Sequence, residues 1–261
     1  MSIDIKNFKE VAAMRVACKM AADTLLLVGN VICEGMSTDD INQVVHEDTI
    51  KKGGIPAPLG YTGKGKVPFP KSVCTSINNV VCHGIPSPFE KLKNGDIINV
   101  DITTIYNGWH GDTSATFLIG NVSKEAKRLV EICKDSMILG IKEVKHGARL
   151  GDIGAAIQSH AEANGFNVVR DYVGHGIGKG FHEEPHVMHF GTRGAGQRIQ
   201  TGMIFTIEPM INAGKRYAKL MPDHWTVITK DRSLSAQWEH TILVTPTGYE
   251  VLTRREEETD L

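Results

Sequence analysis

An internal duplication constrains the fold of this chain more than any other feature of its sequence. Gly35–Ile41 resembles Gly147–Ile153, and each segment is followed by a helical pattern that ends at a glycine, either Gly53 or Gly165. Both landmarks recur after 112 residues. Because similarity repeated at a fixed offset is the signature of a duplicated unit, we expect two related halves.

The elements around these landmarks are also shared. Amphipathic stretches over about 6–33 and 123–145 precede them and predict one long helix in each half. Gly95–Asp101 and Gly202–Glu208 are Gly-led alternating segments that end on a carboxylate, and each predicts a strand. The order helix, helix, strand is therefore expected twice.

These matches predict the fold class. Val81–Ile85 resembles Val173–Ile177, again in the same order along both halves. We expect one α/β domain over residues 1–261, with helices covering an antiparallel sheet and halves at about 5–120 and 121–253. The halves should face each other across a pseudo-twofold axis, with one functional site at the seam.

Composition narrows the class of protein. The 261 residues are 41% hydrophobic and 23% charged with a net charge of −1, which gives no reason to expect nucleic acid or an anionic membrane as a partner. The five cysteines have irregular spacing and form no C-x-x-C pair. No apolar run reaches the length of about 18 residues that would span a membrane. We therefore expect a cytoplasmic monomer without a disulfide framework.

One predicted β-hairpin places two carboxylates. Asn107-Gly108 favours a type I′ turn, because both central residues of that turn adopt positive φ. Residue i on the first strand then faces residue 215 − i on the second, so Asp101 faces Ser114. Asp112 faces Thr103 and becomes a diagonal neighbour of Asp101 on the same face, with Cα atoms about 7–8 Å apart. Such a pair is able to share two metal ions about 3.5–4 Å apart.

Three further residues complete a candidate metal centre. Glu208 lies in the apolar segment Met203–Met210, and Glu239 directly precedes an apolar strand pattern. These two acids are expected to form the equivalent pair in the second half. His175 stands between two glycines, which let the backbone approach closely and leave the imidazole accessible. Each residue alone also fits a structural role, such as a solvated strand acid, a buried acid paired with a base, or an exposed histidine.

Together these residues favour a metal. Carboxylates that converge on one point raise one another's pKa values, so they need compensation by cations. One imidazole and four carboxylates form a hard, oxygen-rich set that favours Mn, Fe, Co or Zn and lacks the thiolates of structural zinc sites. We predict a hydrolase with two divalent ions, held by Asp101, Asp112, His175, Glu208 and Glu239.

Seven motifs carry a resemblance to a known family. In chain order they are His83-Gly-Ile-Pro, Ile98-Asn-Val-Asp-Ile-Thr, His110-Gly-Asp-Thr-Ser, Gly174-His-Gly-Ile-Gly, Phe181-His-Glu-Glu-Pro, Phe205-Thr-Ile-Glu-Pro-Met and Gln237-Trp-Glu-His-Thr. From about residue 5 to residue 253 the chain resembles the type I methionine aminopeptidases. That resemblance implies the pita-bread fold and a metal-dependent exopeptidase that removes the initiator methionine from nascent proteins when the second residue is small.

The resemblance also implies a role for each metal ligand. Asp112 and Glu239 would bridge both ions. His175 and Glu208 would complete one ion, and Asp101 would complete the other.

Catalysis and substrate binding are assigned in the same way. The resemblance implies that His83 and His182 orient the scissile bond and that Glu208 shuttles a proton to the leaving amine. His83 also fits a satisfied core histidine, and His182 also fits a simple pair with Glu183 or its neighbour. The residues implied to bind the substrate are Tyr61, Cys74, His83, Phe181, His182 and Trp225.

The remaining expectations concern the periphery of the site. Asn78, Val80 and Ser235 match positions that offer backbone oxygens to a monovalent cation. The chain departs from the family pattern at Pro58 and over residues 62–69, where Phe69 is expected in place of a tyrosine. Lys64 and Lys66 in that loop are expected to form a solvated rim.

Three other functions remain open on the sequence. A prolidase or aminopeptidase P would use a similar catalytic fold, although those enzymes usually carry a further N-terminal domain. A non-catalytic binding module would keep the fold without the ligands, and a dinuclear phosphoesterase would use a similar ligand set. Under the favoured interpretation, the partner is a nascent polypeptide N-terminus emerging from the ribosome.

Overall fold

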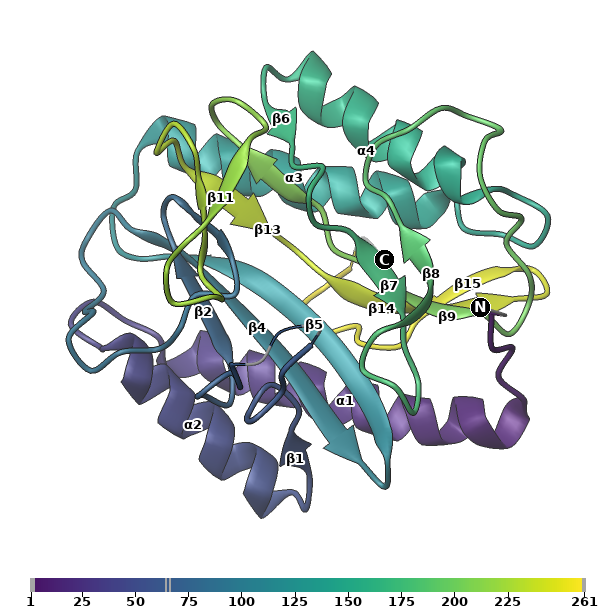
Figure 1. The fold of residues 1–261 in the computed structure, drawn as a ribbon, viewed down its shortest axis with the longest axis horizontal. Coiled ribbons are helices and arrows are strands. Elements are labelled where there is room, and N and C mark those ends of the chain that lie inside the picture. The colour runs from purple at the N-terminus through teal and green to yellow at the C-terminus, as the bar shows by residue number, and fades with distance from the viewer. Residues whose placement is uncertain (1–2, 64, 66, 260–261) are drawn as a thin grey trace.

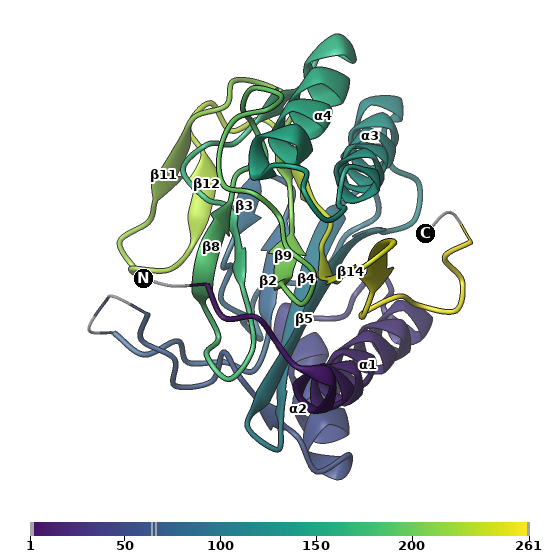
Figure 2. The same ribbon diagram turned by 90° about the vertical axis from the view of Figure 1, so that its right-hand side faces the viewer.

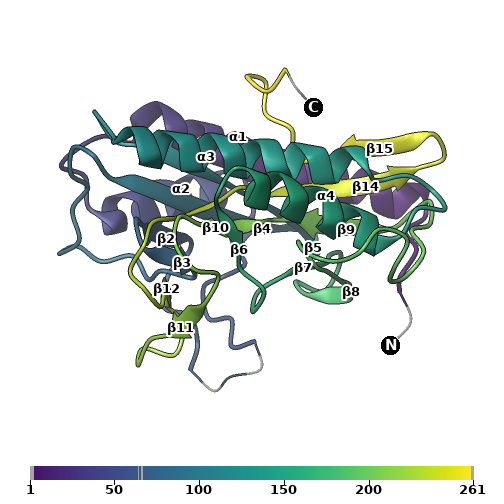
Figure 3. The same ribbon diagram turned by 90° about the horizontal axis from the view of Figure 1, so that it is seen from above.

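Helices cover one face of a twisted antiparallel sheet, and loops and short hairpins lie on the other face (Figures 1 and 3). The computed structural model describes residues 3–63, 65 and 67–259. Lys64 and Lys66, the expected basic rim, lie outside the described residues. None of the helices in the described part of the chain is long and apolar enough to cross a membrane.

The first half contains two helices and then strands. Its elements are α1 (Phe8–Val31), α2 (Thr38–Lys51), β1 (Ile55–Pro56), β2 (Cys74–Ile77), β3 (Val80–Cys82), β4 (Ile97–Tyr106) and β5 (Trp109–Leu118). The second half follows the same order. Its elements are α3 (Lys124–Lys142), α4 (Leu150–Ala163), β6 (Asn167–Val168), β7 (Gly174–Gly176), β8 (Glu183–Val187), β9 (Ile204–Ile207), β10 (Met210–Asn212), β11 (Ala218–Leu220), β12 (Val227–Thr229), β13 (Ser235–Gln237), β14 (His240–Thr245) and β15 (Gly248–Val251).

The predicted duplication is confirmed in the element boundaries. Helices α2 and α4 begin 112 residues apart, and so do strands β1 and β6. Each helix starts in the same way, because an acid in its first turn accepts the backbone N–H of the N-cap residue. Asp40 does so for α2 and Asp152 for α4, with N···O distances of 2.7 and 2.8 Å.

The first-half hairpin has the predicted register. In the ladder of β4 and β5, Asp101 pairs with Ser114 and Thr103 pairs with Asp112. The turn residues Asn107 and Gly108 both have positive φ, as a type I′ turn requires. Strand β4 runs past Asp101 to Tyr106, because the hairpin pairing continues up to the predicted turn.

The second half builds its equivalent ribbon from interrupted strands. Strand β9 pairs with β14, where Ile207 faces His240, and β10 pairs with β13, where Met210 faces Gln237. Both pairings follow one antiparallel register, so the intervening Glu208 and Glu239 lie opposite each other. The chain between β10 and β13 leaves this ribbon over residues 213–234, forms the β11–β12 hairpin, and pairs β12 with β3 of the first half.

A short backbone bridge joins the two halves. The N–H of Glu239 donates to the carbonyl of Ser114 at 3.1 Å, and the N–H of Ser114 donates back to Glu239 at 3.4 Å. This bridge connects β5 to the ribbon of the second half at the two strands that carry predicted ligands. Backbone pairing therefore crosses the expected seam at this point.

Each half packs its own helices against the sheet. Ala21, Leu25 and Val28 of α1 pack in one buried cluster with alternate residues of β4, including Ile98 and Val100. A second cluster joins α3 and α4 to strands β9 and β14. Because side chains alternate along a strand, the residues between those of the core point to the opposite, open face. Figure 2 shows α3 above and α1 below, both on the same side of the sheet.

Helix α1 packs so closely on β5 that Gly111 is required there. A Cβ at this position would lie 2.4 Å from the backbone of Ala17 and Cys18. We expect Gly111→Ala to lower the free energy of unfolding by about 1–3 kcal/mol, because the helix must move away from the strand. Urea denaturation measures this change. Leu118→Ala, at an exposed position on the same strand, is the control, and equal midpoints for the two variants would contradict the expectation.

Candidate metal centre

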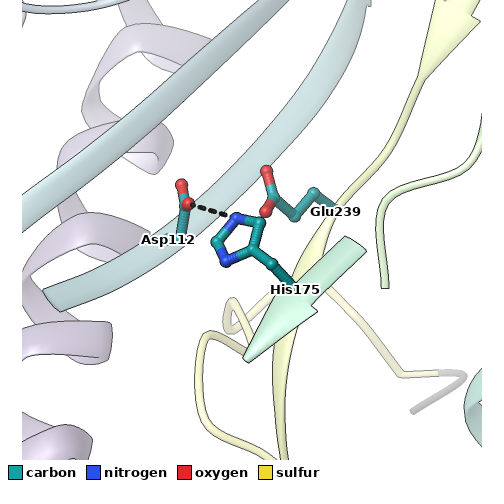
Figure 4. Close-up of side chains that lie close together, drawn as sticks. All are labelled: Asp112, His175 and Glu239. Atoms are coloured by element: carbon teal, nitrogen blue, oxygen red, sulfur yellow. Dashed lines mark ion pairs between the residues drawn. The ribbon is translucent and has the colours of Figure 1, made fainter. Parts of the chain in front are cut away.

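Three of the predicted ligands form a tight group at the seam. Ligand atoms of Asp112, His175 and Glu239 all lie within 4.8 Å of one another, and all three residues are buried (Figure 4). Asp112 comes from β5, His175 from β7, and Glu239 from the link between β13 and β14. The group therefore combines both halves of the sheet.

Asp101 and Glu208 lie beside this group. Both line the same cavity as the other three, and Glu208 Oε1 is 3.6 Å from His175 Nε2. Two neighbours hold the Glu208 carboxylate in place. Its Oε1 accepts the hydroxyl of Thr206 at 2.7 Å, and its Oε2 accepts the side-chain amide of Gln237 at 3.3 Å.

The imidazole of His175 presents its Nε2 atom to the buried acids. Its Nδ1 donates to the carbonyl of Gly176 at 2.9 Å, so the neutral ring presents Nε2 as an acceptor, 3.7 Å from Asp112 Oδ2. Burial lowers the pKa of His175 to about 4, which keeps the ring neutral. The flanking glycines are required, because a Cβ at Gly174 would lie 2.4 Å from the carbonyl of Thr206.

All four carboxylates have raised pKa values. Burial is the main cause, and it raises the pKa of Asp101 to about 7 and that of Glu208 to about 8. For Asp112 and Glu239 the pKa lies well above its ordinary value, because mutual repulsion adds to burial. Such a cluster stores unfavourable energy when ionised, unless a cation shares the space.

The surroundings supply no such cation from the protein. Among the described residues, no lysine or arginine lines the cavity that these side chains share. The buried Oε1 of Glu239 also has no hydrogen-bond partner within the described chain, although buried polar atoms are nearly always paired. An imidazole acceptor, four carboxylates and an unpaired buried oxygen fit divalent metal ions.

The cavity brings together every predicted catalytic, substrate-binding and metal residue. Its volume is about 530 Å³, which suits an amino-acid side chain and its flanking peptide bonds. The predicted residues in its lining are Tyr61, Cys74, His83, Asp101, Asp112, His175, Phe181, His182, Glu208, Trp225 and Glu239. The lining combines this buried group of acids with aromatic side chains that contact one another, including Tyr61 with Phe181 and with Trp225.

The aromatic portion surrounds His182. Tyr61 stacks on this ring at 5.3 Å between centroids, and its hydroxyl lies 2.8 Å from His182 Nδ1. Burial and the neighbouring histidines lower the pKa of His182, while burial raises that of Tyr61. The tyrosine hydroxyl is therefore the donor, and Nε2–H of His182 is left free to donate. The alternative pair of His182 with Glu183 is not formed, because Glu183 binds elsewhere.

His83 faces the same space from the end of β3. Its ring makes edge contacts with Tyr172 at 5.7 Å and with Trp225 at 6.3 Å between centroids. The backbone of His83 adopts a φ of 55°, which is uncommon for a residue with a side chain and is concentrated at functional sites. Burial lowers its pKa to about 4, so the ring is neutral.

Comparison with known proteins agrees with this geometry. Residues 12–246 match the family described as metallopeptidase family M24. Methionine aminopeptidase B of Synechocystis sp. is 51% identical over 94% of this chain and 89% of its own length. A crystal structure of methionine aminopeptidase from Rickettsia prowazekii is 49% identical, with a TM-score of 0.93 over 97% of this chain and 100% of that chain.

This chain belongs to metallopeptidase family M24, among its methionine aminopeptidases. The predicted family and pita-bread fold are thus confirmed. A prolidase from Pyrococcus furiosus shares the fold alone, at 20% identity and a TM-score of 0.75 over 97% of this chain and 66% of that chain.

An ion pair between Lys6 and Glu183, which was not predicted from the sequence, holds the loop that carries His182. Lys6 is buried, and its Nζ lies 2.7 Å from Glu183 Oε2 and 2.6 Å from Asp4 Oδ2. The other carboxylate oxygen of Glu183 accepts the N–H of Gly180 at 2.7 Å. The N-terminal segment therefore fixes the loop that presents Phe181 and His182 to the cavity.

Other cavity residues of this M24 chain were also missed. Thr103, Tyr172, His186 and Met210 line the cavity, and the hydroxyl of Thr103 donates to Asp112 Oδ1 at 2.8 Å. The predicted hairpin register, which places Thr103 opposite Asp112, was the available signal for this contact.

The predicted monovalent-cation residues lie outside the described lining of the cavity, and Asn78 there accepts the N–H of Ser235 at 2.8 Å. Pro58 and Phe69 do line the cavity, so the departures from the family pattern fall at its wall.

Metal binding by this M24 chain should depend on pH in a defined direction. In the folded protein the pKa of Asp101 is about 7, against an ordinary value of 3.8, and that of Glu208 is about 8, against 4.5. The metal-free folded protein therefore holds protons that the unfolded chain releases. Stability of the metal-free protein should fall as pH rises from about 4 to about 8, and saturating Mn²⁺ should raise Tm more at about pH 8 than at about pH 5. Thermal melts with Mn²⁺ or with EDTA measure this, and equal shifts at both pH values would contradict it.

Proposed function

We propose that this chain removes the initiator methionine from nascent polypeptides whose second residue is small. The observation that carries the proposal is the single cavity in which a buried acidic cluster adjoins an aromatic wall. Such a cavity binds an apolar side chain at one end and places its peptide bond beside the acids at the other. Membership of the methionine aminopeptidases supports the same reaction.

The proposed metal centre holds two divalent ions, with Co, Mn, Fe or Zn as candidates. Asp112 and Glu239 would be shared by both ions, since their carboxylates belong to the tightest group in the cavity. His175 and Glu208 would serve one ion, and Asp101 the other. When bound, the ions would act as Lewis acids toward the scissile carbonyl and lower the pKa of water near neutral pH.

The side chains around this centre would orient the peptide. Because the Tyr61 hydroxyl occupies Nδ1 of His182, the Nε2–H of His182 would donate to a carbonyl of the substrate. His83, which directly follows β3, would supply a second neutral imidazole. Glu208, held by Thr206 and Gln237, would carry a proton to the leaving amine.

Aromatic contacts support the proposed methionine pocket. Phe181 lies 4.9 Å from Tyr61 between ring centroids, and Trp225 lies 5.4 Å from Phe69 in a T-shaped contact. A thioether side chain is polarisable and packs well against ring edges. Cys74, whose neighbour across the sheet is Asp101, would contact the same side chain at the base of the pocket.

The proposal has further parts that concern the whole protein. Residues 1–261 would form one catalytic domain of two halves, at about 5–120 and 121–253, and would act as a cytoplasmic monomer on chains emerging from the ribosome. A monovalent cation is proposed near the backbone oxygens of Asn78, Val80 and Ser235. A small second residue is expected in substrates, because a bulky one would crowd the acidic end of the cavity.

Peptide cleavage tests the reaction itself. With added Mn²⁺ or Co²⁺ we expect methionine release from Met-Ala-Ser and little release from a Met-Lys peptide, measured by chromatography of the products. An Xaa-Pro peptide distinguishes the related prolidase and aminopeptidase P activities. Cleavage of Xaa-Pro bonds without release of methionine would overturn the proposal.

The histidine roles have a separate test. We expect His83→Ala and His182→Ala each to lower kcat/KM by about 100-fold or more, because each removes a donor to the substrate. Metal content, measured by mass spectrometry, should stay near two ions per chain. Tyr61→Phe, which removes only the hydroxyl that holds His182, should lower kcat/KM by about tenfold or less. Equal loss of metal and activity in the histidine variants would instead make those histidines ligands.

A further inference from the structure

Behind the metal centre lies a buried polar network that the reaction does not use. It is formed by the C-terminal segment, Thr253–Glu258, on the helix-covered side of the sheet (Figures 2 and 3). Arg255 and Glu258 are 5% and 3% exposed, and their side chains form an ion pair. Buried ion pairs carry a large desolvation cost, so their placement here calls for an explanation.

One end of this network is bound to the first half. Arg255 Nη1 donates to the hydroxyl of Thr113 at 3.1 Å, and Thr113 directly follows Asp112 in β5. The same hydroxyl donates to the backbone carbonyl of Glu239 at 2.8 Å. Because side chains alternate along a strand, Thr113 points away from the cavity while Asp112 points into it.

The other end is bound to the second half. His240 Nδ1 lies 2.9 Å from the hydroxyl of Thr253, and His240 Nε2 lies 3.2 Å from Glu258 Oε1. Thr253 Oγ1 also accepts the N–H of Thr241 at 3.0 Å. These contacts hold the two residues that follow Glu239 in the chain.

Two more contacts close the network. The hydroxyl of Thr241 donates to the backbone carbonyl of Asp112 at 2.8 Å. The guanidinium of Arg255 lies 5.7 Å from the ring of Trp238, the residue before Glu239. Every residue next to Glu239 is thus held by the C-terminal segment, and the backbone of Asp112 is tied to the same set.

From this arrangement we infer that Arg255 and Glu258 are positioning residues for the metal centre, which fix the separation of Asp112 and Glu239 and so set the affinity for divalent ions. The inference rests on the proposed function, in which both acids bind both ions. Neither Arg255 nor Glu258 lines the cavity among the described residues, so they act only through the strands. Removal of such supporting contacts typically costs about 10–100-fold in metal affinity.

Thr113→Val is the most direct test, because it keeps the shape of the side chain and leaves no buried charge unpaired. Calorimetric titration with Mn²⁺ alone should give a Kd about tenfold higher than for the wild-type protein. Thr113→Ser keeps the hydroxyl and should restore the wild-type Kd. Arg15→Met breaks the Arg15–Glu250 pair, a bidentate but exposed pair away from the site, and should leave the Kd unchanged.

A double variant separates positioning from stability. Arg255→Met alone leaves Glu258 buried without its partner and should destabilise the fold, whereas Arg255→Met with Glu258→Met removes both charges and should recover Tm. If the network positions the ligands, the double variant keeps an elevated Kd for Mn²⁺ despite its recovered Tm. A wild-type Kd in both Thr113→Val and the double variant would overturn the inference.

The outcome can be distinguished from failure of the proposed function. A wild-type protein that binds Mn²⁺ but releases no methionine, with weaker binding in the variants, would overturn the function and support the positioning role. Methionine release by the wild-type protein, with equal Mn²⁺ affinity in all variants, would support the proposed function and overturn the positioning role.

Discussion

The repulsion among buried carboxylates is the constraint on which this structure depends. Asp112 and Glu239 are 3% and 1% exposed, and the described wall of their cavity offers no basic side chain to compensate them. A sheet would not normally tolerate such a cluster, because isolated buried charge is costly. The acids are held in this arrangement by backbone and side-chain hydrogen bonds of the strands that carry them, and divalent cations would compensate their charge.

Duplication explains how these acids come together. Each half contributes a two-stranded ribbon that carries a pair of acids, and each ribbon is backed by its own helices and hydrophobic cluster. The bridge between Ser114 and Glu239 joins the ribbons at the point where the acids converge. Two units, each with its own hydrophobic cluster, thus place a charged centre at their junction, where neither cluster needs to accommodate it.

Local patterns in the sequence predict a large part of this arrangement. Asn107-Gly108 determines the register of β4 and β5, and acids within apolar strand patterns indicate a metal centre by their chemistry alone. Contacts between distant side chains cannot be predicted in this way. Tyr61 and His182 are 121 residues apart, and Arg255 and Thr113 are 142 apart. No periodicity or turn signal records such pairs, since they depend on how completed elements pack.

The excursion over residues 213–234 shapes the substrate cavity without forming part of the ribbon that carries the acids. The ribbon register is held on both sides of it, by β9 with β14 and by β10 with β13. Its own strand β12 instead pairs with β3, and its Trp225 forms part of the cavity wall. Substitutions or insertions within the excursion can therefore reshape what the cavity accepts while the reacting centre keeps its geometry. The fold is in this sense modular, and new substrate preferences are accessible to it without loss of the underlying chemistry.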